Sequence, residues 1–156
     1  MTTLLYLRRN TCAGKMILFI VKKSNGLNNG KYLGIGGHFE DGESPNDCIL
    51  RELNEETGIT SKEVSGLKLR GIVTFVNSKC DNEYMHVFEG VYEGIGIINK
   101  DYTSEGELTW IPEEKIYDLP IWEGDKVIFD KLFKEREFFN LKLVYEGDEL
   151  VETISY

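Results

Sequence analysis

The chain has 156 residues, of which 41% are hydrophobic, and its formal net charge is −9. A chain of about 150 residues buries close to 70% of its unfolded surface, so we expect one domain spanning residues 1–156. The negative charge argues against a nucleic-acid polymer or an anionic membrane as the main partner, because such binders carry basic patches. A small phosphate ester that brings its own metal ions remains compatible.

Three cysteines, Cys12, Cys48 and Cys80, are widely separated and include no Cys-x-x-Cys pair. They indicate neither a disulfide framework nor a zinc site, and we expect them to be reduced and mostly buried. The N-terminal segment is charged too early for a signal peptide, and no apolar run approaches the roughly 20 residues of a membrane span. We expect a cytoplasmic protein, either a monomer or a homodimer.

Two aliphatic and β-branched runs open the chain, at residues 3–9 and 15–22, and a turn over residues 10–14 separates them. This pattern predicts a β-hairpin. The following residues, 24–37, hold five glycines and three asparagines, which predicts a loop with a short strand near residues 32–35. A flexible hairpin loop and a loop that passes over a ligand both fit this composition.

Residues 45–57 have the periodicity of an amphipathic helix. At 100° per residue, the apolar arc holds Ile49, Leu50 and Leu53, and the neighbouring acidic arc holds Glu52, Glu55 and Glu56. Three carboxylates at such spacings repel one another, by roughly 0.2–0.5 kcal/mol per exposed pair, so we expect a cation beside them. Hard oxygen ligands of this kind suit Mg²⁺, with Mn²⁺ as an alternative.

Both ends of this helix carry capping signals. Ser44 is a good N-cap, Pro45 suits the first helical position, and Asp47 completes a capping arrangement two residues later. Gly58 suits the left-handed position that ends a helix. These signals agree with the periodicity and fix the predicted bounds of the helix.

The remainder of the chain alternates β-branched or aromatic runs with helical segments. The predicted strands are residues 67–76, 84–93, 107–111, 138–145 and 149–155, the last two as a hairpin. The predicted helices are a short one at residues 112–117 and a longer one at 125–136. No internal repeat or linker interrupts the chain, so we expect one α/β unit with a mixed sheet.

The segment from Gly37 to Ile59 also matches a known signature at every specified position. Gly37 is followed by five residues, Glu43, seven residues, and then the run RELNEETGI that starts at Arg51. A chance match at nine specified positions is on the order of one in a million. The chain thus resembles the Nudix hydrolases. The resemblance implies an α/β/α sandwich around a mixed β-sheet, and hydrolysis of a phosphoanhydride bond in a nucleoside diphosphate linked to another group.

The resemblance also implies roles for individual residues. The implied metal ligands are the carbonyl of Gly37 and the carboxylates of Glu52, Glu55, Glu56 and Glu105. Glu107 competes with Glu105 for the place of the acid outside the signature, and either Glu52 or Glu55 is the general base. Arg51 is implied to orient the glutamates through a salt bridge with Glu43 or Glu52. Without the resemblance, Arg51 would be an ordinary surface partner of Glu55.

Beyond the signature, the chain resembles the MutT-like oxidised-purine nucleoside triphosphatases over roughly residues 4–155. The similar segments are KYLGIGGHFEDGE, HVFEG and the C-terminal run that begins LPIWEGDKV. This resemblance implies a pocket in which the indole of Trp122 stacks on a purine and Asp125 donates or accepts hydrogen bonds at the base edge. The substrate-binding set that we expect is Leu33, Trp122, Asp125, Tyr32 and Lys23. Otherwise Trp122 is a buried anchor and Asp125 a helix cap.

Three positions depart from the animal enzyme of this subfamily: Leu33 replaces an asparagine, Leu27 an aromatic residue and Gly124 a second acid. Leucine packs on a purine but cannot read its hydrogen-bonding edge. The implied activity is Mg²⁺-dependent pyrophosphohydrolysis of a nucleoside triphosphate such as 8-oxo-dGTP. The alternatives are unmodified nucleotides, ADP-ribose, dinucleoside polyphosphates and a non-catalytic nucleotide-binding module, although the signature has lost none of its acids.

Overall fold

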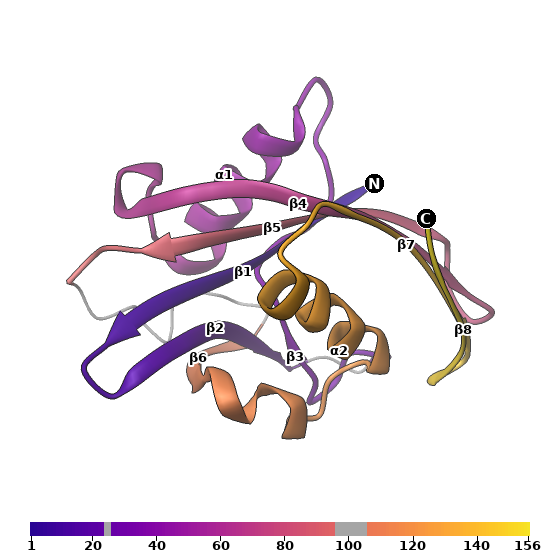
Figure 1. The fold of residues 1–156 in the computed structure, drawn as a ribbon. Coiled ribbons are helices and arrows are strands. Elements are labelled where there is room, and N and C mark those ends of the chain that lie inside the picture. Colours follow the sequence, from indigo (N-terminus) through magenta and orange to yellow (C-terminus); the bar gives the residue numbers. More distant parts are fainter. Residues whose placement is uncertain (24–25, 96–105) are drawn as a thin grey trace.

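The computed structural model describes residues 1–23, 26–95 and 106–156. These residues form one mixed sheet of eight strands with helices on both faces (Figure 1). The strands are β1 (Thr2–Thr11), β2 (Gly14–Lys22), β3 (Tyr32–Leu33), β4 (Val64–Asn77), β5 (Glu83–Tyr92), β6 (Gly106–Pro112), β7 (Phe139–Glu146) and β8 (Glu149–Ser155). The helical segments are α1 (Pro45–Thr57), η1 (Ser61–Glu63), η2 (Glu113–Asp118), α2 (Glu123–Phe129) and η3 (Asp130–Glu135).

The strand order along the sheet is β3-β2-β1-β5-β4-β7-β8, with β6 on the other edge of β2. Two neighbouring pairs, β1 with β5 and β4 with β7, are parallel. The β1–β2 and β7–β8 hairpins are antiparallel, as the sequence predicts. The expectation of a mixed sheet is confirmed.

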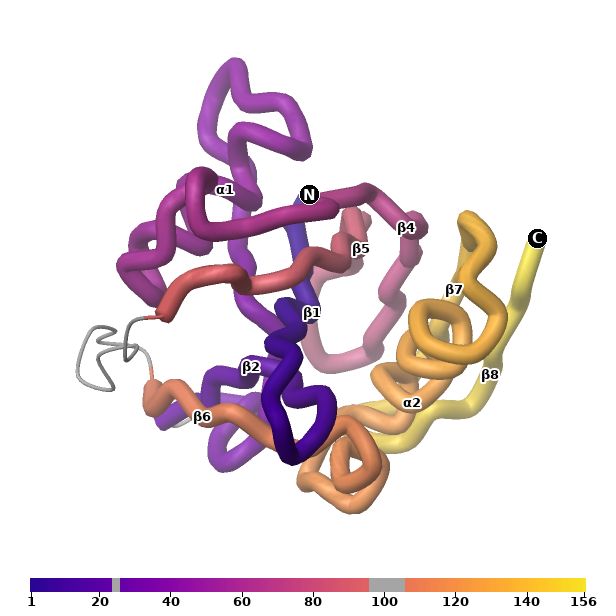
Figure 2. Tube along the Cα trace, turned by 60° about the vertical axis from the view of Figure 1, so that its left-hand side comes forward, coloured from indigo at the N-terminus to yellow at the C-terminus, as the bar shows by residue number. Residues whose placement is uncertain are grey.

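The two faces of the sheet pack against different helices, because side chains alternate along a strand. On β1, Leu5 and Leu7 belong to the same hydrophobic core as Leu53 of α1. Tyr6, between them, belongs to the other core and meets the ring of Phe129 from α2 edge-on, with ring centroids 4.9 Å apart. Figure 2 shows α1 and α2 on opposite sides of the sheet. The α/β/α arrangement is therefore confirmed.

The strands β1 and β2 pair through residues 8–11 and 14–17, at the hairpin end. Farther along β1, the loop that follows β3 takes the place beside it. Leu5 and Ile35 exchange two backbone hydrogen bonds, of 2.7 and 3.0 Å, and Thr3 donates its N–H to the carbonyl of Gly37 at 2.9 Å. This pairing fixes the Gly36–Gly37 backbone between the sheet and α1.

Helix α1 begins and ends where its capping signals predict. The hydroxyl of Ser44 accepts from the N–H of Asp47, and the Asp47 carboxylate accepts from the N–H of Ser44 at 3.0 Å. Gly58 is left-handed, with φ 73°, and donates its N–H to Asn54 at 2.8 Å. An N-cap of this kind contributes about 0.5–2 kcal/mol to helix stability. The caps therefore hold the acidic residues of α1 in register.

Two expectations need correction. The helix predicted over residues 125–136 starts earlier, at Glu123, and continues after Phe129 as the wider helical turn η3, which ends at Glu135 and is capped by the left-handed Arg136, with φ 62°. Of the cysteines, all of which are free, Cys48 is buried whereas Cys12 and Cys80 are exposed. Cys12 lies in the β1–β2 turn and Cys80 in the β4–β5 turn, at the ends of the strands.

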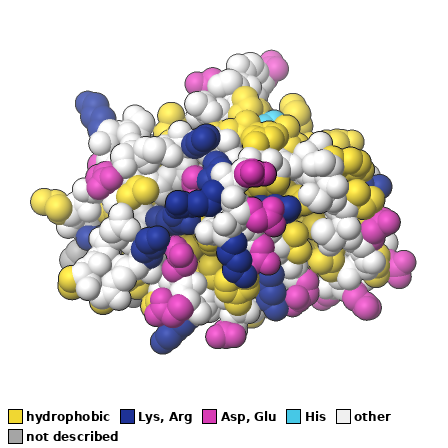
Figure 3. Space-filling model, viewed as in Figure 1, with side chains coloured by type: hydrophobic (Ala, Val, Ile, Leu, Met, Phe, Trp, Pro, Cys, Tyr) yellow, Lys and Arg dark blue, Asp and Glu magenta, His cyan; other side chains and the backbone are white. Residues whose placement is uncertain are grey.

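The surface has mixed charge on the side that carries α2. Figure 3 shows Lys and Arg side chains interspersed with Asp and Glu on this face. In the part of the chain that the structure describes, no helix is long and apolar enough to cross a bilayer.

Candidate active site

A cleft of about 730 Å³ runs between the Gly36–Gly37 segment and the start of α2. Its walls come from β1, the loop before β3, α1, β4 and α2. At one end lie Gly37 and Glu52 of the signature with the preceding Gly36, and at the other lie Trp122 and Asp125. The fold thus brings the two predicted halves of the site, which are far apart in sequence, into one cavity.

At the signature end, Arg51 cross-links three carboxylates. It donates to Glu43 from Nε at 2.7 Å and from Nη2 at 3.0 Å. Its Nη1 donates to Glu52 at 2.9 Å and to Glu55 at 3.1 Å. Nη2 also donates to the backbone carbonyl oxygen of His38 at 2.9 Å. The sequence left open whether Arg51 binds Glu43 or Glu52, and in the structure it binds both.

This network has an electrostatic consequence. The hydrogen bonds from Arg51, followed by one from the Glu40 backbone, lower the pKa of Glu43 to about 2. In return, these carboxylates, Glu43 first, raise the pKa of Arg51 above its already high ordinary value. The guanidinium therefore favours the ionised form of Glu43.

Glu56 lies deeper than its neighbours, with 6% of its surface exposed. One carboxylate oxygen accepts the N–H of Gly36 at 3.0 Å, and the other lies 3.8 Å from the Nζ of Lys22. Glu52 lies against Gly37 so closely that a Cβ built on that glycine would be 2.5 Å from its carboxylate oxygen. Glycine at position 37 therefore leaves the space in which the Glu52 carboxylate sits.

The oxygen atoms at the signature end of the cleft are of a kind, and in a position, that suits a divalent cation. The donors around the cleft are carboxylate and backbone oxygens, which Mg²⁺ and Mn²⁺ prefer. Within the described ranges, no three Asp, Glu, His or Cys side chains already converge on one point. Arg51 draws Glu52 and Glu55 to itself, while Gly36 and Lys22 hold Glu56. A cation held by these glutamates would therefore compete with the two basic side chains for the same oxygens.

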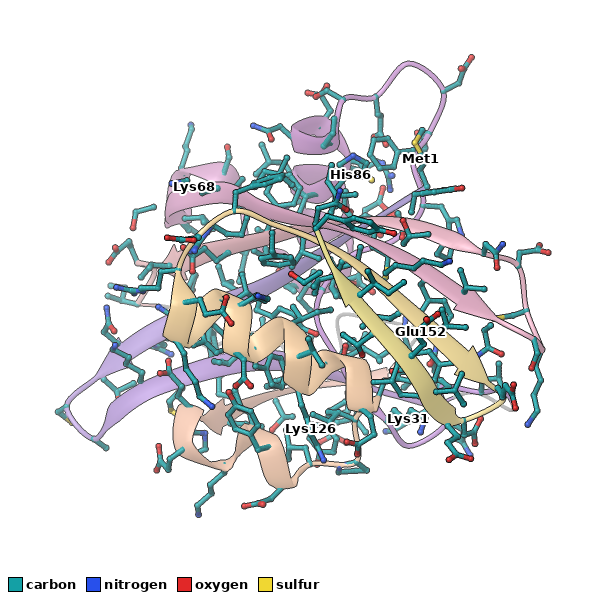
Figure 4. The ribbon with its side chains drawn as sticks, turned by 45° about the vertical axis from the view of Figure 1, so that its right-hand side comes forward. Met1, Lys31, Lys68, His86, Lys126 and Glu152 are labelled. Atoms are coloured by element: carbon teal, nitrogen blue, oxygen red, sulfur yellow. The ribbon has the colours of Figure 1, made fainter. Side chains whose placement is uncertain are left out.

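At the other end of the cleft, Trp122 is fixed on several sides. Its indole N–H donates to the side-chain oxygen of Asn28 at 2.8 Å. The Nζ of Lys31 lies 4.4 Å from the centre of its ring, and the rings of Tyr145 and Phe75 meet it edge-on, with centroids 5.2 and 6.3 Å away. Figure 4 shows Lys31 near the start of α2. A cation over an indole face contributes about 0.5–1 kcal/mol at an exposed site.

Asp125 lines the cleft one helical turn after Trp122. Tyr6 donates its hydroxyl to one carboxylate oxygen at 3.2 Å, and the N–H of Trp122 donates to the other at 3.3 Å. Burial raises the pKa of Asp125 to about 7, against the lowering effects of these hydrogen bonds and of Lys31. Near neutral pH the side chain can therefore donate as well as accept a hydrogen bond.

The structure separates the remaining expected substrate residues. Leu33 lines the cleft. Tyr32 does not line it, because its ring packs in the core against Phe19, with centroids 6.2 Å apart. Lys23 is exposed and pairs with Glu107 at 3.5 Å, so the lysine in the cleft wall is its neighbour Lys22. Adjacent residues at the end of a strand point to opposite sides, which accounts for the exchange.

Glu105, the expected acid outside the signature, lies outside the described residues. Its competitor Glu107 is exposed at the start of β6, in the pair with Lys23. Among the described residues, Glu83 of β5 also lines the cleft and lies 3.1 Å from Nε2 of His38, beside the signature.

Sequence reasoning missed Lys22, Asn28 and Lys31. Lys22 is the last residue of an aliphatic strand, and nothing local distinguishes it from Lys23. Asn28 is followed directly by Asn29, which is exposed and does not line the cleft. Their contacts join residues as far as 94 positions apart, so no local pattern could identify them.

Comparison with known proteins shows the family of the chain. The NUDIX domain profile matches residues 3–132. The Nudix hydrolase YvcI of Bacillus subtilis (strain 168) is 32% identical over 130 residues, which are 81% of this chain and 78% of YvcI. The NAD-capped RNA hydrolase NudC of Vibrio parahaemolyticus is 32% identical over 102 residues, but the chain spans only 36% of NudC.

Among solved structures, the MutT protein from Bacillus halodurans superposes with a TM-score of 0.77 at 25% identity, over 99% of this chain and 95% of that one. The chain belongs to the Nudix family. It is a hydrolase of the class that cleaves phosphoanhydride bonds in nucleoside diphosphate-linked substrates, and this family is typically dependent on divalent metal ions.

Proposed function

We propose that this protein is a Mg²⁺-dependent nucleoside triphosphate pyrophosphohydrolase that converts an oxidised purine deoxynucleotide, such as 8-oxo-dGTP, to the monophosphate and pyrophosphate. The observation that carries the proposal is the single cleft, which joins the signature end at Glu52 to an aromatic end at Trp122 and Asp125. A nucleoside triphosphate has its reacting phosphates at one end and its base at the other. The acidic end of the cleft suits the phosphates with their metal ion, and the end with the indole suits the base.

The reaction that we assign to the signature end is attack of water on a phosphorus atom. The new bond joins the water oxygen to phosphorus, the anhydride P–O bond breaks, and the water proton passes to a glutamate. Gly37, Glu52, Glu55 and Glu56 would hold the divalent cation, with Glu105 as a further ligand outside the described residues. A bound cation would neutralise the phosphate oxygens and acidify the attacking water.

At the signature end, some protein groups would take part through their charge and others by positioning their neighbours. Glu52 and Glu55 are the candidates for the general base, and each accepts a hydrogen bond from Arg51. Arg51 orients both carboxylates through these hydrogen bonds, so it acts as a positioning residue. Lys22 lies in the cleft wall and supplies positive charge beside Glu56, where phosphate oxygens would otherwise meet acids alone.

At the base end, we assign the stacking surface to Trp122 and the polar contact at the base edge to Asp125. Leu33 and Leu27 supply apolar walls, and neither can hydrogen bond to a base. The choice among purines then depends on few polar groups. Because the partly buried Asp125 can donate or accept near pH 7, it can match a keto or an amino position.

The test is a panel of 8-oxo-dGTP, 2-hydroxy-dATP, dGTP, ADP-ribose and a dinucleoside polyphosphate, compared by kcat/KM with Mg²⁺ and with Mn²⁺. We expect release of pyrophosphate and the highest value for an oxidised purine triphosphate. Equal values for 8-oxo-dGTP and dGTP would reject the oxidised-purine preference. Tight binding without hydrolysis of any nucleotide would instead identify a non-catalytic binding module.

A further inference from the structure

Asn28 lines the base end of the cleft and is held there by one hydrogen bond with a defined direction. Its side-chain oxygen accepts the indole N–H of Trp122 at 2.8 Å. The indole nitrogen can only donate, so the amide oxygen must face it. The amide orientation of Asn28 is therefore determined by Trp122, whose ring is fixed in turn by Tyr145 and Phe75.

This orientation leaves the amide nitrogen of Asn28 without a recorded acceptor among the described residues. The nitrogen carries two N–H donors, and the residue is only partly buried, in the wall of a cleft large enough for a nucleotide. A donor in such a place is solvated when the cleft is empty, and it loses that water when a ligand enters. An acceptor on the ligand must then replace the water, or affinity falls.

A second polar group at this end is attached to the same tryptophan. Asp125 accepts the backbone N–H of Trp122 at 3.3 Å, while Asn28 accepts its indole N–H. A base stacked on Trp122 would thus meet an amide donor and a carboxyl group that are both fixed relative to the indole. The other charged group at the indole is Lys31, whose ammonium lies over the ring, and Leu33 adds no polar atom.

We propose that Asn28 is a specificity-determining residue that donates a hydrogen bond from its amide nitrogen to a keto oxygen on the edge of a purine stacked on Trp122. This proposal rests on the proposed function. It assigns to Asn28 the polar recognition that Leu33 cannot provide. Keto purines present an acceptor to this donor, whereas the 6-amino group of an adenine would place a donor against it.

The test uses Asn28→Asp, with Asn29→Asp as the matched control. The aspartate keeps an oxygen for the indole of Trp122 but replaces the N–H donors with a second acceptor. Asn29 is exposed, does not line the cleft and undergoes the same change of charge. We would compare kcat/KM for 8-oxo-dGTP, dGTP and 8-oxo-dATP. The three triphosphates carry the same phosphate charge, so repulsion by the new carboxylate cancels in their ratios.

We expect Asn28→Asp to reduce at least one selectivity ratio by about tenfold or more. A change in the ratio of 8-oxo-dGTP to 8-oxo-dATP would assign the contact to the oxygen at position 6 of the base. A change in the ratio of 8-oxo-dGTP to dGTP would assign it to the oxygen at position 8. Asn29→Asp should leave both ratios within about twofold of wild type, as is usual for a surface substitution.

Fluorescence of Trp122 separates base recognition from support of the indole. The chain has two tryptophans, so Trp110→Phe leaves Trp122 as the single reporter. Asn28→Asp should keep the emission of the parent protein, whereas Asn28→Ala, which removes the acceptor, should shift it. An equal shift in both variants would overturn the proposal, because Asn28 would then act only on the indole.

If both kcat/KM selectivity ratios are unchanged in Asn28→Asp, the proposal that Asn28 determines specificity is also overturned. Failure of the proposed function would look different, since the wild-type protein itself would then hydrolyse none of the three nucleotides or would treat 8-oxo-dGTP and dGTP alike.

Discussion

The two ends of the cleft are built in contrasting ways. At the signature end, the acidic groups are crowded on one helix and the loop before it, and one arginine holds three of them together. At the base end, the polar groups are few and come from distant segments, with Asn28 and Asp125 both attached to Trp122. The first end is organised by local spacing and the second by contacts across the fold.

This difference predicts which substitutions should affect turnover and which should affect substrate choice. The charge-rich end can supply hydrolysis to many nucleotides, because phosphates are common to all of them. The base end has little polar redundancy, so each of its hydrogen-bonding groups should influence selectivity. Substitutions at the two ends should therefore separate turnover from substrate choice.

The largest effect is expected for Glu56→Gln. The amide can still accept the N–H of Gly36, so the fold should be kept, but the charge that we assign to the divalent cation is lost. We expect kcat to fall by at least about 100-fold, with an unchanged thermal unfolding midpoint. Glu152→Gln, on the exposed edge strand β8 and labelled in Figure 4, is the control and should retain wild-type activity. Full activity in Glu56→Gln would refute the assignment.

A smaller loss is expected for Arg51→Ala. The substitution releases Glu43, Glu52 and Glu55, which then repel one another and lose their orientation. Loss of a residue that orients metal ligands typically costs about 10–100-fold in activity, measurable as kcat at saturating Mg²⁺. Arg51→Lys keeps the charge but not the planar fork, so it should recover only part of the activity. If Arg51→Ala behaves as wild type, the network does not position the catalytic groups.

The smallest effect, and the one that depends most on pH, is expected for Asp125→Asn. In the unfolded chain Asp125 should ionise near its ordinary pKa of 3.8, whereas burial raises its pKa in the folded protein to about 7. As pH rises from about 4 to 7, protons leave the unfolded state first, so wild type should lose stability relative to Asp125→Asn. Above pH 7 the difference should stay constant.

The difference of about three pKa units corresponds to at most about 4 kcal/mol. Partial exposure of the carboxyl group to solvent reduces this, so we expect the stability difference to change by on the order of 2 kcal/mol, measured by urea unfolding at a series of pH values. Asp118→Asn, an exposed position, should show no such trend. A difference between wild type and Asp125→Asn that does not vary with pH would mean that the carboxyl group is solvated as an ordinary aspartate.

Much of the fold follows from local sequence. The bounds of α1 could be predicted because Ser44, Pro45 and Gly58 impose backbone conformations that do not depend on tertiary contacts. The hairpins could be predicted from their alternation of strand and turn residues. The sequence could not predict that residues 35–38 lie beside β1 after residues 32–33 have paired with β2, since the contact between Leu5 and Ile35 spans the whole of β2 in the sequence.

The same distinction applies to the site. Arg51 and the glutamates could be named from the signature, because they lie within one and a half turns of the same helix. Lys23 was expected in the cleft where Lys22 lies, because the sequence does not say which of two adjacent residues at the end of a strand points into the cleft. Tyr32 was expected beside Leu33, but it packs in the core.

By itself, the sequence determined the chemistry that the protein carries: an acidic helix, its caps and the Nudix signature all depend on short-range spacing. Only the tertiary structure decided which groups surround Trp122 and Asp125 in the cleft. Tyr6 and Asp125 are 119 residues apart, and Asn28 and Trp122 are 94 apart. Such pairs meet only when the sheet and α2 are packed, and no periodicity in the chain encodes their meeting.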